Sequence, residues 1–114
     1  MYAIVRADLG MSAGKIASQA GHAYLDAYLE TQKQNPDKCA AYKTGHGIKV
    51  CLVARNELQL RKLEMACVNR GIPHKLIEDL GYTCFEGRTT ITALGVGPIR
   101  QEELPELNKM GIMS

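Results

Sequence analysis

YAIVRADLGMSAGKIASQAGHAYLDAYLETQKQ, residues 2–34, is the stretch that decides the fold, because a short apolar run is followed by a long segment without proline. The run 2–6 predicts a buried strand. Ser12 is a good N-cap residue, so we expect a helix over 13–34 that stops before Pro36. A strand that is followed by a helix in this way is typical of the start of an α/β fold.

The rest of the chain continues this alternation of strands and helices. We expect a short helix from Pro36 that is closed by Gly45 or Gly47, and a helix that Asn56 caps and Gly71 ends. Further strands are predicted at 48–54, 74–79 and 89–96, and a last short helix over about 101–107.

A helical crossover makes the first two strands parallel, and the short link between the last two makes that pair antiparallel. The predicted fold is therefore α/β: one domain over 1–114, in three α/β/α layers, with a four-stranded mixed sheet and helices on both faces.

Composition limits the classes of protein and partner. The chain has 114 residues, of which 46% are hydrophobic and 23% charged, and its net charge is +2. That balance excludes a disordered chain, a collagen-like fibre and a disulfide scaffold, and it shows no general bias toward nucleic acid. With no apolar run near 20 residues and no signal peptide, we expect a cytoplasmic protein without a membrane partner. The sequence leaves the oligomeric state open, a homodimer included.

The four cysteines, at 39, 51, 67 and 84, include no CxxC pair. We interpret them as buried free thiols, and the spacings typical of a metal site are absent.

The first candidate site lies at the start of the long helix. Gly14-Lys15 is no phosphate loop, because Leu9 stands where glycine is required and Ile16 replaces the magnesium-binding Ser or Thr. A helix N-terminus with a lysine beside it nevertheless favours an anion. Helical spacing then puts Lys15, Gln19 and His22 in one polar stripe, which is either part of a site or a solvated helix surface.

The second candidate site follows the third predicted strand, where Asp79 precedes a group of hydroxyl residues: Thr83, Thr89, Thr90 and Thr92. Strand alternation places Thr90 and Thr92 on one face. A carboxylate beside hydroxyls can orient or deprotonate a water, but the same residues are also common in turns and strands. From these residues alone, chemistry and structure both remain open.

Taken together, the two clusters resemble the type 2 peptidyl-tRNA hydrolases of archaea and eukaryotes. Residues 5–23 are similar to that family's signature, R-x-D-L-x-M-x-x-G-K-x-A-x-Q-x-x-H-A. Further similar segments follow in order, at 47–53 (GIKVCLV), 71–73 (GIP), 77–79 (IED) and 92–98 (TALGVGP). The resemblance covers the chain to about residue 99.

This resemblance implies hydrolysis of the ester between a peptide and the 3′ ribose of tRNA, with no cofactor and no metal. By position it makes Lys15, Asp79, Thr83 and Thr92 catalytic, and it gives Gln19 and His22 a role in shaping the site, to which we add Thr90. The residues that we expect to contact the tRNA near the mouth of the site are Arg6, Lys15, Lys43, Lys49, Tyr82 and Arg88.

The chain departs from the family in the segment 79–84, which reads DLGYTC where the family usually reads D-A-G-R-T-Q. Tyr82 replaces an arginine and Cys84 an amide. The alternative to an active hydrolase is therefore a non-catalytic relative that binds RNA or protein.

Overall fold

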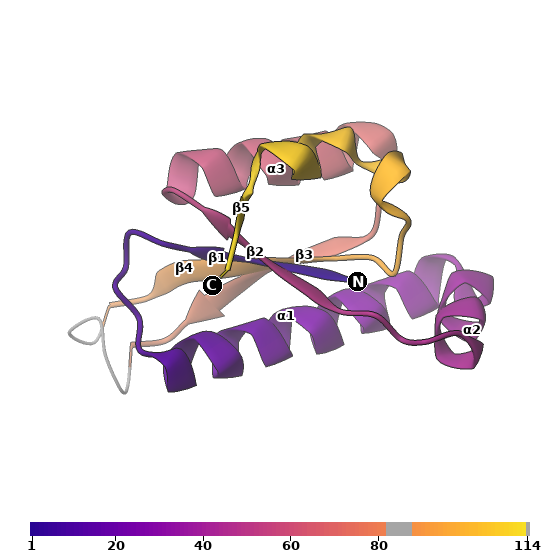
Figure 1. The fold of residues 1–114 in the computed structure, drawn as a ribbon, viewed down its shortest axis with the longest axis horizontal. Helices are drawn as coiled ribbons and strands as arrows, with labels where there is room; N and C mark the ends of the chain where they lie inside the picture. Colours follow the sequence, from indigo (N-terminus) through magenta and orange to yellow (C-terminus); the bar gives the residue numbers. More distant parts are fainter. Residues whose placement is uncertain (82–87, 114) are drawn as a thin grey trace.

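The computed structural model describes residues 1–81 and 88–113, and Figure 1 shows their arrangement. The predicted Thr83 and Tyr82 lie outside this part of the chain, as does Cys84. The helices are α1 (Ala13–Gln34), α2 (Pro36–Thr44) and α3 (Glu57–Arg70), with the short 3-10 helices η2 (Gln101–Glu103) and η3 (Pro105–Lys109). The strands are β1 (Tyr2–Arg6), β2 (Val50–Ala54), β3 (His74–Asp79), β4 (Thr90–Val96) and β5 (Gly111–Ile112).

Local signals in the sequence set the helix ends. The Ser12 side chain accepts a hydrogen bond from the backbone N–H of Lys15, which caps α1. Asn56 caps α3 in the same way, and Gly71 ends α3 in the left-handed conformation, with φ 66°. These three predicted helix ends are confirmed.

The sheet has the strand order β3-β4-β1-β2-β5. β1 and β2 are parallel and β3 and β4 are antiparallel, as predicted. The predicted count of four strands is wrong, because β5 adds a fifth that pairs Ile112 with Leu52 and Gly111 with Val53. A strand of two residues is too short to show alternation in the sequence. The prediction of one last helix over about 101–107 is also wrong. The chain instead forms two 3-10 helices, η2 and η3, which are separated by Leu104, the residue before Pro105.

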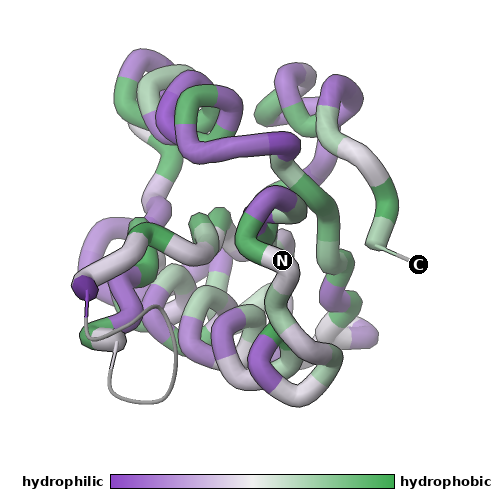
Figure 2. Tube along the Cα trace, turned by 90° about the vertical axis from the view of Figure 1, so that its left-hand side faces the viewer, coloured by the Kyte–Doolittle hydropathy of each residue, from purple (hydrophilic) through white to green (hydrophobic). Residues whose placement is uncertain are grey.

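The helices lie on opposite sides of the sheet, with α1 and α2 on one side and α3 with the 3-10 helices on the other (Figure 1). Large side chains such as Ile4, Leu60 and Leu94 fill the α3 side. The α1 side is packed with smaller residues, among them Ala20, Ala23 and Ala93. In Figure 2 hydrophilic and hydrophobic residues alternate along the helices, as expected where one face of a helix covers a sheet.

Gly95 shows how closely α1 approaches the sheet. A Cβ at this position of β4 would lie 2.0 Å from the carbonyl oxygen of Ala23 in α1. Only glycine fits there, so the small-residue stripe of α1 and Gly95 together fix the height of the helix above the sheet.

Among residues 1–81 and 88–113, no helix combines the length and the apolar character that crossing a bilayer requires.

Candidate active site

An ion pair joins the two clusters that the sequence singled out. Lys15 comes from the first turn of α1 and Asp79 from the end of β3, and Lys15 Nζ donates a short hydrogen bond to Asp79 Oδ2. The two side chains are only 18% and 9% exposed. The second carboxylate oxygen, Oδ1, accepts the backbone N–H of Gly81 at 2.6 Å. Both oxygens of Asp79 are thus oriented from the protein side.

The same contacts keep Asp79 ionised. The hydrogen bond from Lys15 lowers the pKa of the Asp79 carboxyl below its usual range, and the Gly81 N–H lowers it further. The positive charge of Lys15 and the nearby His22 act in the same direction, whereas burial opposes them. The site therefore offers a carboxylate and an ammonium in contact at neutral pH.

This pair lies at one end of a pocket of about 610 Å³ between α1 and β3. From α1 the pocket is lined by Lys15, Ser18, Gln19, His22 and Asp26, and from the sheet by residues 75–80. The structure therefore brings together four of the predicted site residues: Lys15, Gln19, His22 and Asp79.

Thr92 lies next to this pocket because the pairing of β3 with β4 is interrupted at this residue. Ile77 pairs with Ala93 whereas Glu78 pairs with Ile91, so Thr92 is an extra residue in β4. Such a bulge turns two consecutive side chains to the same face. Ala93 accordingly packs on the α1 side, and the Thr92 hydroxyl also reaches α1.

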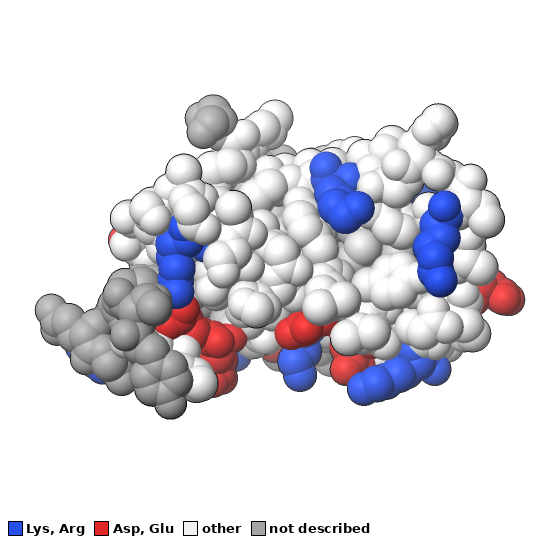
Figure 3. Space-filling model, turned by 90° about the horizontal axis from the view of Figure 1, so that it is seen from below, with Lys and Arg blue, Asp and Glu red and all other residues white. Residues whose placement is uncertain are grey.

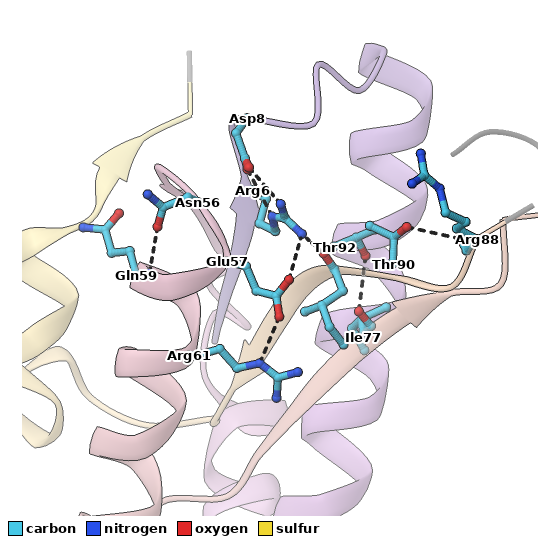
Figure 4. A network of polar contacts seen from close by, with 11 residues as sticks. Arg6, Asp8, Asn56, Glu57, Gln59, Arg61, Ile77, Arg88, Thr90 and Thr92 are labelled. Atoms are coloured by element: carbon cyan, nitrogen blue, oxygen red, sulfur yellow. Dashed lines mark hydrogen bonds and ion pairs between the residues drawn. The ribbon is translucent and has the colours of Figure 1, made fainter. Parts of the chain in front are cut away.

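The bulge connects Thr92 to Gln19. Thr92 Oγ1 donates to Gln19 Oε1 at 2.5 Å. The carbonyl of Ile77 lies 3.4 Å from the same hydroxyl (Figure 4). The first distance lies at the short end of the range for an O–H···O bond and below the range for N–H···O, so the amide presents its oxygen to Thr92 and its Nε2 on the other side. Thr92 is fully buried and Gln19 is 4% exposed. Gln19, predicted as part of a polar stripe, is therefore a buried pocket residue.

Thr90, in contrast, lines a neighbouring hollow with Leu9 and Arg88. Its hydroxyl donates to the carbonyl of Arg88 at 3.2 Å (Figure 4). The structure thus does not bring Thr90 into the pocket of Lys15 and Asp79.

Arg6 is held in a network within the protein (Figure 4). Its Nε and one terminal nitrogen donate to the two carboxylate oxygens of Asp8 at 3.0 and 2.8 Å. The other terminal nitrogen donates to the carbonyl of Ile91 at 2.9 Å and lies 3.5 Å from Glu57. All three guanidinium nitrogens are engaged and the side chain is 11% exposed, so Arg6 braces β1 against β4 and α3.

Two predicted contacts near the mouth lie elsewhere. Lys43 is in α2, beyond the far end of α1, whose 22 residues span about 33 Å. Lys49 precedes the start of β2, where Val50 pairs with Tyr2, whereas the site lies at the opposite end of the strands. A crossover connection puts the start of β2 beside the start of β1, so the prediction that these lysines lie near the mouth is wrong.

Lys and Arg side chains are spread along the whole α1 side of the molecule rather than gathered in one patch (Figure 3). On this side, the lysines and arginines of the described residues therefore form no single basic patch.

Among the residues that sequence reasoning missed in the pocket are three charged ones: Asp26, Lys75 and Glu78. Two of them carried a signal. Asp26 extends the stripe of Lys15, Gln19 and His22 by one more helical turn, and Lys75 lies on the same side of β3 as Asp79 by strand alternation. Across the part of the chain that the structure describes, no three His, Cys, Asp or Glu side chains are grouped as a metal site requires.

Comparison with known proteins gives a consistent result. A family model described as peptidyl-tRNA hydrolase PTH2 matches residues 1–110. The chain is 31% identical to a peptidyl-tRNA hydrolase of Methanocaldococcus jannaschii over 107 residues, which cover 94% of this chain and 92% of that protein. It is 38% identical to a peptidyl-tRNA hydrolase of Thermococcus onnurineus over 99 residues, or 87% and 83% of the two chains.

A eukaryotic relative is also similar over most of the chain. The chain is 34% identical to the probable peptidyl-tRNA hydrolase 2 of Schizosaccharomyces pombe over 100 residues, which cover 87% of this chain and 49% of that protein. Since the family model spans almost the whole length and these relatives match most of it, the chain belongs to the peptidyl-tRNA hydrolase PTH2 family.

Proposed function

We propose that this chain hydrolyses the ester between a peptide and the 3′ ribose of tRNA, in the pocket between α1 and β3. The observation that carries the proposal is the Lys15–Asp79 pair, a carboxylate and an ammonium in contact at the end of a pocket, in a chain of the peptidyl-tRNA hydrolase family. The reaction needs a positioned water and stabilisation of an oxyanion, and the pocket offers groups for both.

Asp79 orients the attacking water. Each carboxylate oxygen retains a lone pair beside its present bond, so a water can donate to Asp79 while its oxygen faces the ester carbonyl carbon. Because the pKa of Asp79 is lowered, it is a weak base, and its contribution is mainly to position the water and share its proton as the C–O bond forms.

Lys15 and Gln19 stabilise the negative charge that develops on the carbonyl oxygen. The Lys15 ammonium supplies charge, and Gln19 supplies the Nε2–H donor that remains once Thr92 holds its oxygen. When the tetrahedral intermediate collapses, the bond to the 3′ oxygen breaks and that oxygen takes the proton that Asp79 accepted. The second proton of the water passes to solvent as the peptide acid ionises, so the products are a peptide carboxylate, a proton and tRNA with a free 3′ hydroxyl.

In this mechanism Thr92 acts through Gln19 and does not touch the substrate, which revises its predicted role as a direct hydroxyl donor. The role expected for Thr83 lies outside the described residues.

The acceptor end of the tRNA approaches from the N-terminus of α1. The first turn of this helix contains no acidic residue, and its N–H groups favour a phosphate. Arg88, at the start of the segment before β4, is the candidate phosphate contact on that side. We place the whole site on one domain, 1–114, and the enzyme in the cytoplasm, where translation releases its substrate.

The test is the release of free tRNA from N-acetyl-aminoacyl-tRNA. Wild type should release it, and Lys15→Met and Asp79→Asn should each lower kcat by about 100-fold or more, as loss of one oxyanion or base contact does. Lys33→Ala is the matched control, because Lys33 lies on the same helix with a 73% exposed side chain and forms an ion pair with its helix neighbour Glu30.

A non-catalytic relative would give a different result. Wild type would bind N-acetyl-aminoacyl-tRNA and release nothing, and that outcome would reject the proposed reaction. Equal release from unblocked aminoacyl-tRNA would instead indicate an esterase of another specificity.

A further inference from the structure

We infer that the pocket continues as a groove in which the peptide part of the substrate binds as an extended strand, parallel to β3 and paired with its free edge. The inference rests on the proposed function, because the ester must lie at Lys15 and Asp79. From that end the groove runs along α1 and β3 to Asp26 and Lys75.

The edge of β3 provides hydrogen-bonding groups for such a strand. β3 is the outermost strand of the sheet, and within the described ranges no strand pairs with its outer edge. In an antiparallel pair, residues that bond across the ladder alternate with residues that do not. The carbonyl of Pro73 accepts a hydrogen bond from the N–H of Gly97, just after β4. Every second residue from Pro73 onward, such as Lys75, therefore forms its backbone hydrogen bonds with β4. Leu76 and the residues two before and after it therefore turn their N–H and C=O groups outward.

The length of the groove sets the number of peptide residues. From Lys75 to Asp79 the strand advances four residues, or about 13 Å. On the facing wall, Lys15 to Asp26 spans eleven residues of α1, or about 16 Å. An extended peptide of about four residues fits this length, with its C-terminal residue at the ester.

The charges of the groove favour a peptide over RNA. Lys15 is paired with Asp79, so the remaining charged side chains that line the groove are Asp26, Glu78 and Lys75, together with the titratable His22. Figure 3 likewise shows acidic and basic side chains interleaved along one edge of this face. Two carboxylates against one lysine repel a phosphate backbone, whereas uncharged peptide groups tolerate them.

The direction of the peptide follows from the chemistry. Its C-terminal carbonyl lies at Asp79, the end of β3, and its N-terminal side points to Lys75. The peptide therefore runs parallel to β3, and every second residue directs its N–H and C=O toward the edge of the strand.

The first experiment uses wild type and tRNA acylated with N-acetylated peptides of one to six residues. We expect kcat/KM to rise roughly 3- to 10-fold for each residue that pairs with the edge and to level off at about four residues. Methylating the backbone nitrogen of one peptide residue at a time should lower kcat/KM at alternate positions only.

The results separate the two proposals. No release from any substrate rejects the hydrolase itself. Release that does not depend on peptide length, or equal losses at every methylated position, rejects the paired strand while the hydrolase stands.

A second experiment uses Leu76→Pro, which removes an outward N–H and leaves the bonds to β4 in place. Leu76→Val is its control, since it changes the side chain and keeps the N–H. Compared with Leu76→Val, Leu76→Pro should show a much smaller rise of kcat/KM with peptide length, with no loss of affinity for deacylated tRNA. If that affinity fell instead, RNA would occupy the groove and the inference would be wrong. Should Leu76→Pro not fold, the methylated series on wild type decides.

Discussion

The buried hydrogen bond between Thr92 and Gln19 makes a quantitative prediction. Thr92→Val replaces the hydroxyl with a methyl group of similar size and removes the donor to Gln19 Oε1. Thr92 has no exposed surface and Gln19 only 4%, so water cannot easily replace the lost donor. The change therefore leaves a buried acceptor without its partner, in a place that otherwise stays filled.

An unsatisfied buried acceptor costs about 1–3 kcal/mol. Burial of the added methyl group offsets part of this cost, so we expect the free energy of unfolding to fall by about 1–2 kcal/mol. For a chain of this length that corresponds to a fall in Tm of roughly 4–8 °C. In Gln19→Leu the hydroxyl of Thr92 keeps the Ile77 carbonyl as an acceptor, so that variant should lose less stability.

The assay is a double-mutant cycle with Thr92→Val, Gln19→Leu and the double variant, followed by urea unfolding and by tRNA release. When both polar groups are removed together no buried partner is left unsatisfied, so the double variant should recover about 1 kcal/mol relative to the sum. Adding Thr92→Val to Gln19→Leu should not lower kcat further. Thr92→Ser, which keeps a hydroxyl, should have a kcat close to that of wild type. A further loss of kcat in the Gln19→Leu background would show that Thr92 acts on the substrate directly and would refute our reasoning.

Three further predictions concern charge, packing and RNA. In wild type the pKa of Asp79 is lower in the folded than in the unfolded protein, so its ionisation stabilises the fold above the unfolded-state pKa near 4, and this stability is lost as pH falls through the folded-state pKa. Lys15→Met removes the main cause of the lowered pKa, so the dependence of Tm on acid pH should shrink. Gly95→Ala should lower the free energy of unfolding by about 1–3 kcal/mol or more in urea unfolding, because its Cβ would meet the Ala23 carbonyl, whereas Gly21→Ala meets nothing and should be neutral or stabilising. Arg88→Ala should reduce the salt dependence of tRNA binding by about one phosphate contact, measured by titration at several salt concentrations, and Arg6→Lys should leave it unchanged and lower Tm instead.

Most of the fold could be predicted because its elements carry strong local signals. Ser12, Asn56 and Gly71 mark helix ends, and the segments that form β1 and β3 have the predicted bounds. β5 could not be predicted, since its two residues depend on a partner, β2, that lies far away in the sequence. Tertiary contact rather than local preference forms that strand.

The candidate site was predictable where a residue's position depends on regular spacing. Lys15 and Gln19 lie on the expected turns of α1, and Asp79 lies at the expected end of its strand. The bulge in β4, which turns Thr92 and Ala93 to the same face, is not visible in the sequence. The charge of Arg6 likewise does not reveal that Asp8 and Glu57 hold it within the protein. Nor do the charges of Lys43 and Lys49 reveal that these residues lie far from the site.

The polar groups of the described site come from the ends and irregularities of regular elements. Lys15 follows the Ser12 cap by three residues, Asp79 is the last residue of β3, and Thr92 is the extra residue of the bulge. The backbone hydrogen bonds of the helix and the sheet fix the position of each of these residues, so only their side-chain rotamers remain to be ordered. Because the ammonium and the carboxylate already touch, the ester carbonyl must compete with Asp79 for Lys15, and binding has to separate the pair partly. A peptide held along β3 would supply binding energy away from the reacting bond for that separation, which links the proposed groove to the rate of the chemical step.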